Sequence, residues 1–280
     1  MKYSMALAAP LCALCSVLTL GSAPQAHAQA DSGNARGPSK YLFLDNVALK
    51  PNAGEAYSKL EADETRILRA AHAPSHYFGA WSITGGDHVL TFNGFDSFAE
   101  LAKDHEATMA LPGLMDNLKA DNAAEAALIA EHHSSIYKYD EDLSLRAPLD
   151  ITKQRFARIL LFHVRSGRGQ DFEHLIKVYA KEYEVFPEAH WAMFEKVYGQ
   201  GSDNTYILVT PFVSVDYVDH MVGSGPKFAA STGLDLLQML RQQASADVES
   251  SESDLYAFGP SISYVPDSWI ASSPDFWGKK

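Results

Sequence analysis

Two pairs of neighbouring residues, each a histidine followed by an aromatic residue, are the part of this sequence best suited to chemistry. They are His76-Tyr77 and His190-Trp191, and each stands at the start of a predicted strand. An imidazole can act as acid, base or hydrogen-bond donor, and an aromatic ring can form the wall of a ligand cavity. The structural alternative is that the histidine caps a strand end while the ring fills the core. We expect five residues to line a ligand cavity: His76, His163, His190, Trp191 and Tyr256.

Motifs that would identify a reaction are missing from the sequence. It has no G-x-S-x-G nucleophile motif and no glycine-rich phosphate-binding motif. His132-His133, Asp104-His105 and Asp219-His220 lack the spacing that aims two ligands at one metal ion, so no metal site is predicted. Whether the protein is an enzyme therefore stays open.

The first 28 residues are predicted to be a signal peptide. A basic start at Lys2 is followed by an apolar stretch and by small residues that suit a cleavage site, Ala26-His27-Ala28. The sequence therefore predicts a secreted protein, with a periplasmic location favoured and no membrane-spanning segment after cleavage. Both cysteines, Cys12 and Cys15, lie in this leader, so the mature chain has no thiol for a disulfide or a thiolate site.

The charge of the chain argues against some partners. Removal of the leader takes away Lys2 alone, which leaves 22 basic and 35 acidic residues and a net charge of −13. Nucleic acids and anionic lipids bind clustered Lys and Arg, and the sequence has no such patch. We expect no nucleic-acid partner, a small-molecule ligand, and a monomer or a homodimer.

An internal repeat is the most informative feature of the sequence. Five ordered segments match when the chain is shifted against itself by about 114 to 119 residues. Tyr41-Leu42-Phe43-Leu44 falls on Arg158-Ile159-Leu160-Leu161, and the pair His76-Tyr77 falls on His190-Trp191. His163 falls on Asn46, so this candidate belongs to one half only.

Each half has the same predicted order of elements, β-α-β-β-α-β. In the first half these are strand 40–49, helix 54–72, strands 76–83 and 87–92, helices across 97–133, and strand 134–139. In the second half these are strand 156–164, helix 172–186, strands 190–198 and 205–209, a short helix near 214, helix 234–248 and strand 254–258. This order is that of a ferredoxin-like unit. Strand residues such as Ile159-Leu160-Leu161-Phe162 are apolar on both faces, so both faces of the sheet must be covered.

This pattern resembles the dimeric α+β barrel superfamily. The resemblance rests on the element order, on the strand-turn-helix segment that ends at Gly169-Gln170-Asp171-Phe172, and on the strand pair from His190-Trp191 to Val209. It implies an α+β fold of two tandem ferredoxin-like units packed sheet to sheet as an intramolecular barrel. The superfamily includes cofactor-free monooxygenases, haem enzymes and proteins without known activity, so the fold does not select a function.

The cofactor is unknown from the sequence, and haem is possible but not favoured. The resemblance implies a proximal histidine on a helix of the second half, for which His174 and His220 are candidates. The distal arginine in an aromatic-rich and methionine-rich segment, which the resemblance to chlorite dismutases would imply, is not found.

The predicted divisions of the chain are a signal peptide at 1–28, a linker at 29–39, a first unit at 40–147, a linker at 148–154, a second unit at 155–266 and a tail at 267–280. Trp269 and Trp277 predict that the tail docks on the barrel, and a partner-binding tail is the alternative. The function predicted is binding of a small apolar or aromatic ligand in a barrel cavity. The alternative is a cofactor-independent monooxygenase or a haem-dependent, peroxidase-like enzyme.

Overall fold

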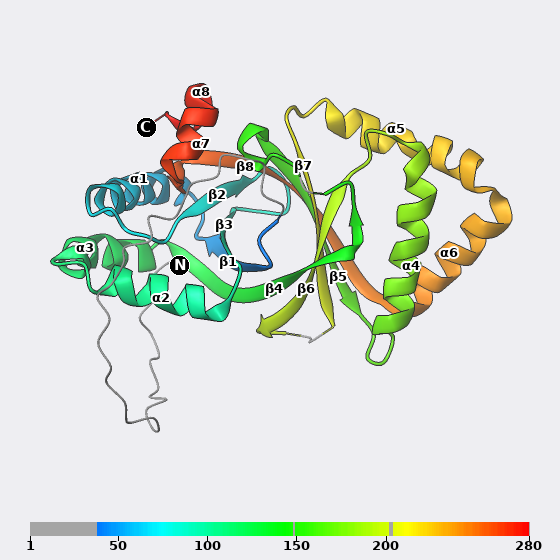
Figure 1. The fold of residues 1–280 in the computed structure, drawn as a ribbon, viewed down its shortest axis with the longest axis horizontal. Coiled ribbons are helices and arrows are strands. Elements are labelled where there is room, and N and C mark those ends of the chain that lie inside the picture. Colours follow the sequence, from blue (N-terminus) through cyan, green and yellow to red (C-terminus); the bar gives the residue numbers. More distant parts are fainter. Residues whose placement is uncertain (1–37, 148, 202–203, 280) are drawn as a thin grey trace, which may run out of the picture.

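The computed structural model describes residues 38–147, 149–201 and 204–279. Eight strands form one closed antiparallel barrel, and helices cover its outside (Figure 1). The first half contains β1 (Tyr41–Leu49), α1 (Gly54–Ala70), β2 (Tyr77–Ser82), β3 (His88–Phe95), α2 (Phe98–Met109), α3 (Leu114–Ala126) and β4 (Ile129–Leu145). The second half contains β5 (Phe156–Val164), α4 (Gly169–Glu182), β6 (Trp191–Gly199), β7 (Thr205–Phe212), α5 (Tyr217–Thr232), α6 (Leu234–Asp247) and β8 (Val248–Tyr264).

The two halves join edge to edge as well as face to face. The strand order around the barrel is β1-β3-β2-β8-β5-β7-β6-β4, and β4 pairs with β1 to close it. Strands β2 and β8 meet at Ala80 and Phe258, and strands β4 and β6 meet at Tyr139 and Phe194. The predicted α+β barrel is therefore confirmed, and hydrogen bonds between the halves close it so that no sheet edge is free.

Strand β5 shows why its residues are apolar on both faces. Ile159 and Leu161 point into the barrel interior, where they join one hydrophobic cluster with side chains of both halves. Leu160 and Phe162 alternate with them and point outward beneath α4 to α6. The prediction that both faces of this strand are covered is confirmed.

The two closing strands are much longer than the sequence predicted. Strands β4 and β8 have 17 residues each, whereas 134–139 and 254–258 were expected. Their polar stretches carry no alternating apolar signal, but they pair with β1 and β5. The other ends of the same strands pair with β6 and β2, so each long strand belongs to both halves of the barrel. These strands are longer than predicted because backbone hydrogen bonds to neighbouring strands extend them, and polar residues can form such bonds too.

Two helices also differ from the expectation. Helix α5 has 16 residues rather than being short, although Pro226 lies inside it. Helix α4 ends at Glu182, and a 3-10 turn, Tyr183–Val185, occupies the remainder of the predicted helix. The turn leads the chain toward Pro187, which cannot continue a helix hydrogen-bond ladder.

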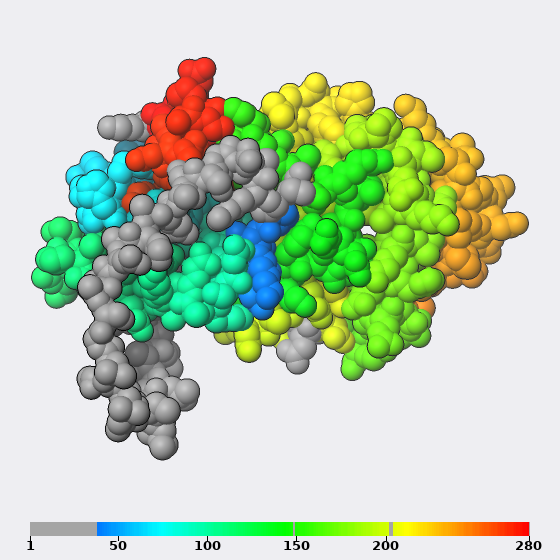
Figure 2. Space-filling model, viewed as in Figure 1, coloured from blue at the N-terminus to red at the C-terminus, as the bar shows by residue number. Residues whose placement is uncertain are grey.

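The C-terminal tail docks on the barrel, as its tryptophans predicted. It forms α7 (Asp267–Ser272) and α8 (Pro274–Trp277), which lie over the first half (Figure 2, red). Trp277 is 4% exposed, and its Nε1 donates a hydrogen bond to the Thr152 carbonyl oxygen at 2.9 Å. Its ring packs against Phe78 and Phe258, so the tail completes the interior cluster.

The predicted signal peptide and residues 29–37 of the predicted linker lie outside the described residues. Among the helices of the described residues, none has both the length and the apolar character needed to cross a lipid bilayer.

Candidate functional site

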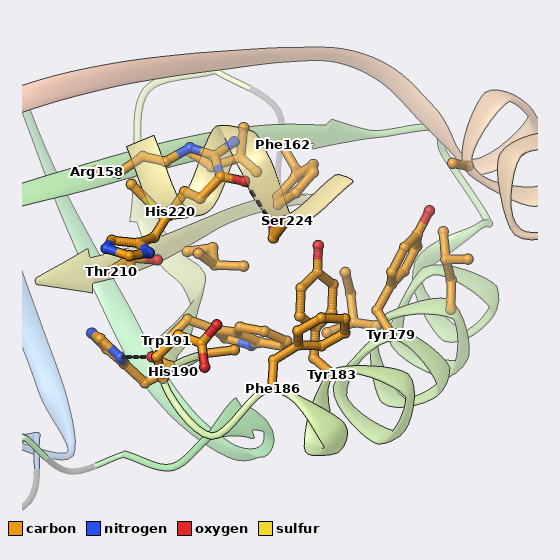
Figure 3. A pocket seen from close by; sticks show the side chains of 18 of the residues that line it. Arg158, Phe162, Tyr179, Tyr183, Phe186, His190, Trp191, Thr210, His220 and Ser224 are labelled. Carbon is orange, nitrogen blue, oxygen red and sulfur yellow. Dashed lines mark hydrogen bonds between the residues drawn. The ribbon is translucent and has the colours of Figure 1, made fainter. Parts of the chain in front are cut away.

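A cavity of about 340 Å³ lies in the second half, between the outer face of the sheet and the helices α4, α5 and α6 (Figure 3). This volume is at the lower end of the range for small-molecule sites. Figure 2 shows a small opening in the surface of this half. The side chains around the cavity are Arg158, Leu160, Phe162, Phe172, Leu175, Ile176, Tyr179, Tyr183, Phe186, Glu188, Ala189, His190, Trp191, Leu208, Thr210, Tyr217, His220, Met221, Ser224, Ala244 and Val248.

The sheet supplies one wall of the cavity through its period of two. On β5 the outward residues are Arg158, Leu160 and Phe162, and on β7 they are Leu208 and Thr210. The inward residues of these strands fill the barrel interior with packed side chains. This cavity therefore lies outside the barrel wall, whereas the ligand site was expected inside the barrel.

Helix α4 and the turn after it supply the opposite wall. Phe172, Leu175, Ile176 and Tyr179 share one helix face, since they are spaced by three and four residues. Tyr183 follows in the 3-10 turn, and its ring stacks on Phe228 of α5 with ring centroids 4.6 Å apart. This wall of the cavity therefore consists of aromatic and aliphatic side chains, and the contact with α5 holds Tyr183 in place.

Arg158 is the main charged group of the cavity. Its Nε donates a hydrogen bond to Ser253 Oγ at 2.8 Å. Within the described part of the chain, no carboxylate forms an ion pair with it, and no atom accepts a hydrogen bond from its two terminal nitrogens. Burial lowers the pKa of this guanidinium from its usual value, but it stays charged at neutral pH.

Tyr183 is a neutral donor beside that charge. Burial raises the pKa of its phenol, and the nearby Arg158 charge and Ser224 hydroxyl counteract the rise. Figure 3 shows the Tyr183 hydroxyl pointing from the helix side of the cavity toward Ser224 and Arg158. Together Arg158 and Tyr183 can donate hydrogen bonds to one acceptor inside an otherwise apolar space.

His190 lines the cavity, as predicted, but it is bound on both sides. Its Nε2 lies 2.7 Å from the Pro211 carbonyl oxygen and its Nδ1 lies 2.7 Å from the Glu188 carbonyl oxygen. Both oxygens can only accept, so a neutral ring can donate to only one of them, and both ring nitrogens lie against backbone carbonyl oxygens. His190 therefore links the start of β6 to the backbone at Glu188 and at Pro211 of β7.

Trp191 also lines the cavity, as predicted. It is 8% exposed, its Nε1 donates to the Leu143 carbonyl oxygen at 2.8 Å, and its ring meets Tyr183 edge to face. This hydrogen bond fixes the indole so that its ring can form part of the cavity wall.

The other three predicted residues are not among those around the cavity. His76 stacks on Tyr264 in the first half with ring centroids 4.7 Å apart. His163 is placed on the inward side of β5 by the alternation of the strand, and its Nδ1 lies 3.5 Å from Thr205 Oγ1. Tyr256 is 8% exposed in the interior cluster of the barrel. These three residues lie away from the cavity, because the alternation of strand residues or the other half of the barrel separates them from it.

Substitution of Tyr256 by phenylalanine is expected to make the protein more resistant to alkali. Burial raises the pKa of Tyr256 to about 12, and the nearby Asp254 and Glu252 add to the rise. Between pH 10 and 12 the unfolded phenol loses its proton while the folded one keeps it, so stability falls as the pH rises. Tyr256→Phe should retain about 1–2 kcal/mol that wild type loses by pH 11.5. Urea unfolding at pH 8 and pH 11.5 measures this difference, and equal losses in both proteins would contradict it.

Helix α5 covers the cavity with a weak helical sequence. Gly223-Ser224-Gly225-Pro226 lies in its middle, and Ser224 Oγ donates to the Met221 carbonyl oxygen at 2.7 Å. Glycine is among the worst helix formers, and proline removes one backbone hydrogen bond. The cavity cover is therefore the part of the second half in which local opening costs least.

Gly223→Ala is expected to raise the free energy of unfolding by about 0.5–1 kcal/mol, because alanine restricts the unfolded chain. A Cβ at this position meets no atom within 4 Å. Gly233→Ala is the matched control, since its φ of +82° is unfavourable for alanine, and it should lower stability instead. Thermal unfolding of both variants shows the two signs, and equal shifts would refute the argument.

The residues Arg158, Tyr183 and Ser224 were missed by sequence reasoning. The repeat contained one usable signal, since Arg158 is a charged residue at the start of an apolar strand and matches Tyr41 in the first half. His220 was considered only as a haem ligand. It lies at the edge of the cavity, where the cavity adjoins a second hollow that also includes His190 and Tyr217.

One carboxylate cluster could hold a metal ion. Glu61, Glu64 and Glu125 are buried between α1 and α3, and their oxygens lie within 4.8 Å of one another. Among residues 38–147, 149–201 and 204–279 it is the only group of three or more His, Cys, Asp or Glu side chains this close together. Oxygen ligands suit hard divalent cations. The sequence analysis did not single out this group, because its members come from two helices.

Comparisons with known proteins identify the fold. No protein-family model matches the chain, and no curated protein matches it significantly. An anthrone oxidase-like protein has a similar solved structure, with 14% identity, a TM-score of 0.54, and coverage of 79% of this chain and 92% of that chain. A monooxygenase-type protein from Fusobacterium nucleatum is 10% identical, with a TM-score of 0.50 and coverage of 79% and 93%. A chlorite dismutase from Candidatus Nitrospira defluvii is 8% identical, with a TM-score of 0.46 and coverage of 84% and 95%.

The fold is an eight-stranded α+β barrel similar to these structures, in agreement with the sequence resemblance to the dimeric α+β barrel superfamily. At such low identities the similarity establishes the fold alone, and the site must be argued from its own residues.

Proposed function

We propose that this protein binds a small aromatic or apolar molecule in the cavity between the second-half sheet and α4, α5 and α6. The observation that supports this most directly is a 340 Å³ space with aromatic and aliphatic walls and a few convergent polar groups. Protein interiors are normally close-packed, and an empty cavity lacks the dispersion contacts that packed atoms would make. A cavity of this size therefore favours a bound ligand. Trp191 and Tyr183 are each held by neighbours, so the walls are formed before a ligand arrives.

We also propose two features that the sequence predicts, namely the duplication of one unit and the export of the protein. Each half, with its strand order β4-β1-β3-β2 or β8-β5-β7-β6, is a ferredoxin-like unit, and the two arose by duplication.

The protein is exported to the periplasm, and removal of residues 1–28 leaves a chain that begins at Gln29. N-terminal sequencing of the protein from a periplasmic extract tests the export, and an N-terminus that retains residues 1–28 would contradict it.

Filling the cavity tests the binding function. Isothermal titration with 2-naphthamide, a neutral two-ring aromatic probe, should show saturable binding to wild type. Ala244 lines the cavity from α6, whereas Ala246 on the same helix is exposed. Ala244→Phe should weaken binding by about tenfold or more, because the added ring takes the ligand's space, while Ala246→Phe should leave it unchanged. Binding that is equal in both variants, or absent from wild type, would overturn the proposal.

A cofactor-independent monooxygenase is the second candidate, and the polar cluster favours it. Arg158 and Tyr183 present donors that could stabilise an aromatic oxyanion in a largely apolar space. The cavity has one imidazole whose ring forms no hydrogen bond with the described residues, His220, which could serve as the base. Oxygen uptake with quinol substrates that is lost in His220→Gln, while 2-naphthamide still binds, would establish turnover. No uptake would leave the binding function alone.

The residues do not fit a haem site. His174 is exposed and lies outside the cavity lining, so it is excluded as the axial ligand. His220 does line the cavity, but no described residue accepts a hydrogen bond from its ring, whereas axial histidines are normally oriented by such a bond. The 340 Å³ space is at the small end for drug-sized molecules, and haem is larger than those. A visible spectrum during haemin titration should therefore show no saturable Soret band.

A further inference from the structure

We propose that the cavity selects an aromatic molecule that carries a carboxylate, and that Arg158 binds this carboxylate. The inference rests on the proposed binding function and adds the chemical class of the ligand. It is carried by the position of one half-buried cation, without an acidic partner among the described residues, at the wall of a largely apolar space.

The first step concerns the charge balance of the cavity. Buried charges in proteins are normally paired, because removing an ion from water is costly. Glu188 is the one acidic residue among the described lining residues, and it is exposed. Its charge acts on Tyr217 rather than on Arg158. The cavity therefore contains a positive charge that no acidic side chain of the described chain neutralises.

The second step concerns hydrogen bonds. Only the Nε of Arg158 is used, through Ser253 Oγ, so the two terminal nitrogens have no acceptor among the described residues. A guanidinium presents its N–H groups in a flat fork that matches the two oxygens of a carboxylate. A ligand carboxylate would supply both the missing charge and the missing acceptors.

The third step concerns the groups around that carboxylate. The raised pKa of Tyr183 keeps its phenol protonated, so it can donate a further hydrogen bond to an anion beside Arg158. The remaining space is bounded by rings, among them Phe162, Phe186 and Trp191. Flat, apolar walls favour a flat, apolar body, and together with Arg158 they define an aromatic acid.

A pair of probes of equal shape tests this inference in wild type. 2-Naphthoate and 2-naphthamide have the same ring system, but only the first is an anion at pH 7. Isothermal titration at low salt should show 2-naphthoate binding about tenfold tighter or more, since hydrogen bonds to a charged group are the stronger ones. Equal affinities would overturn the inference while leaving the proposed binding function in place. Binding of neither probe would instead overturn the binding function itself.

Three variants then test whether Arg158 causes the preference for 2-naphthoate. Arg158→Met replaces the guanidinium with an unbranched, uncharged side chain, so it should abolish the preference for 2-naphthoate over 2-naphthamide. Arg241→Met on α6 removes the same charge from an exposed residue that does not line the cavity, and it should keep the preference. Arg158→Lys should retain a weaker preference, because the ammonium keeps the charge without the fork. A preference that survives in Arg158→Met, or that Arg241→Met removes equally, would contradict the role of Arg158.

Discussion

Truncation of Trp277 to alanine is expected to lower the free energy of unfolding by about 3–5 kcal/mol. The indole is 4% exposed and packs against the rings of Phe78, Phe258, Trp269 and Phe276. Its loss leaves a cavity in the interior cluster and also leaves the Thr152 carbonyl oxygen without its donor. Urea unfolding measures the loss as a shift of the midpoint.

The control for this prediction is another large aromatic residue that is not buried. Tyr198 is 63% exposed on β6, and Tyr198→Ala should cost less than about 1 kcal/mol. Comparable losses in the two variants, or no loss in Trp277→Ala, would mean that the tail does not contribute to the core. The partner-binding alternative for the tail would then regain support.

Replacement of Arg168 by methionine is expected to lower stability by about 3 kcal/mol. Arg168 precedes α4 and binds Asp247, the last residue of α6, whose side chain is fully buried. The Nε of Arg168 lies 2.8 Å from Asp247 Oδ1 and Nη2 lies 2.5 Å from the same atom. Without the arginine, a buried carboxylate is left uncompensated, which costs more than the pair contributes. Because this pair holds α4 against α6, the variant should also weaken 2-naphthamide binding.

Two further variants separate the buried charge from the surface one. Arg168 also pairs with Asp171 at 2.7 Å, but that carboxylate is 49% exposed, so Asp171→Asn should cost less than about 1 kcal/mol. The double variant Arg168→Met with Asp247→Asn should recover part of the stability, since no buried charge remains. A double variant as unstable as the sum of its single losses would contradict this explanation.

The two halves differ at the matching His-aromatic pairs. His190 and Trp191 line the cavity, because Trp191 begins a strand whose outer face is covered by helices and His190 directly precedes it. His76 occupies the matching position in the first half but packs on Tyr264, so the repeat preserved the element and not the cavity. The repeat alone could not reveal this difference, since cavity formation depends on side chains from several elements that approach one another only after folding.

The sequence by itself determined the element order, the two covered faces of β5 and the docked tail. These features follow from local periodicity and from the need to bury apolar residues, both of which are properties of consecutive residues. The tertiary structure decided the length of β4 and β8, the joining of the sheet edges, the bonds that hold His190, and the isolation of Arg158 among aromatic rings. Each of these depends on partners remote in the sequence, and whether a buried group finds its acceptor or its counter-charge is settled only when those partners meet in space.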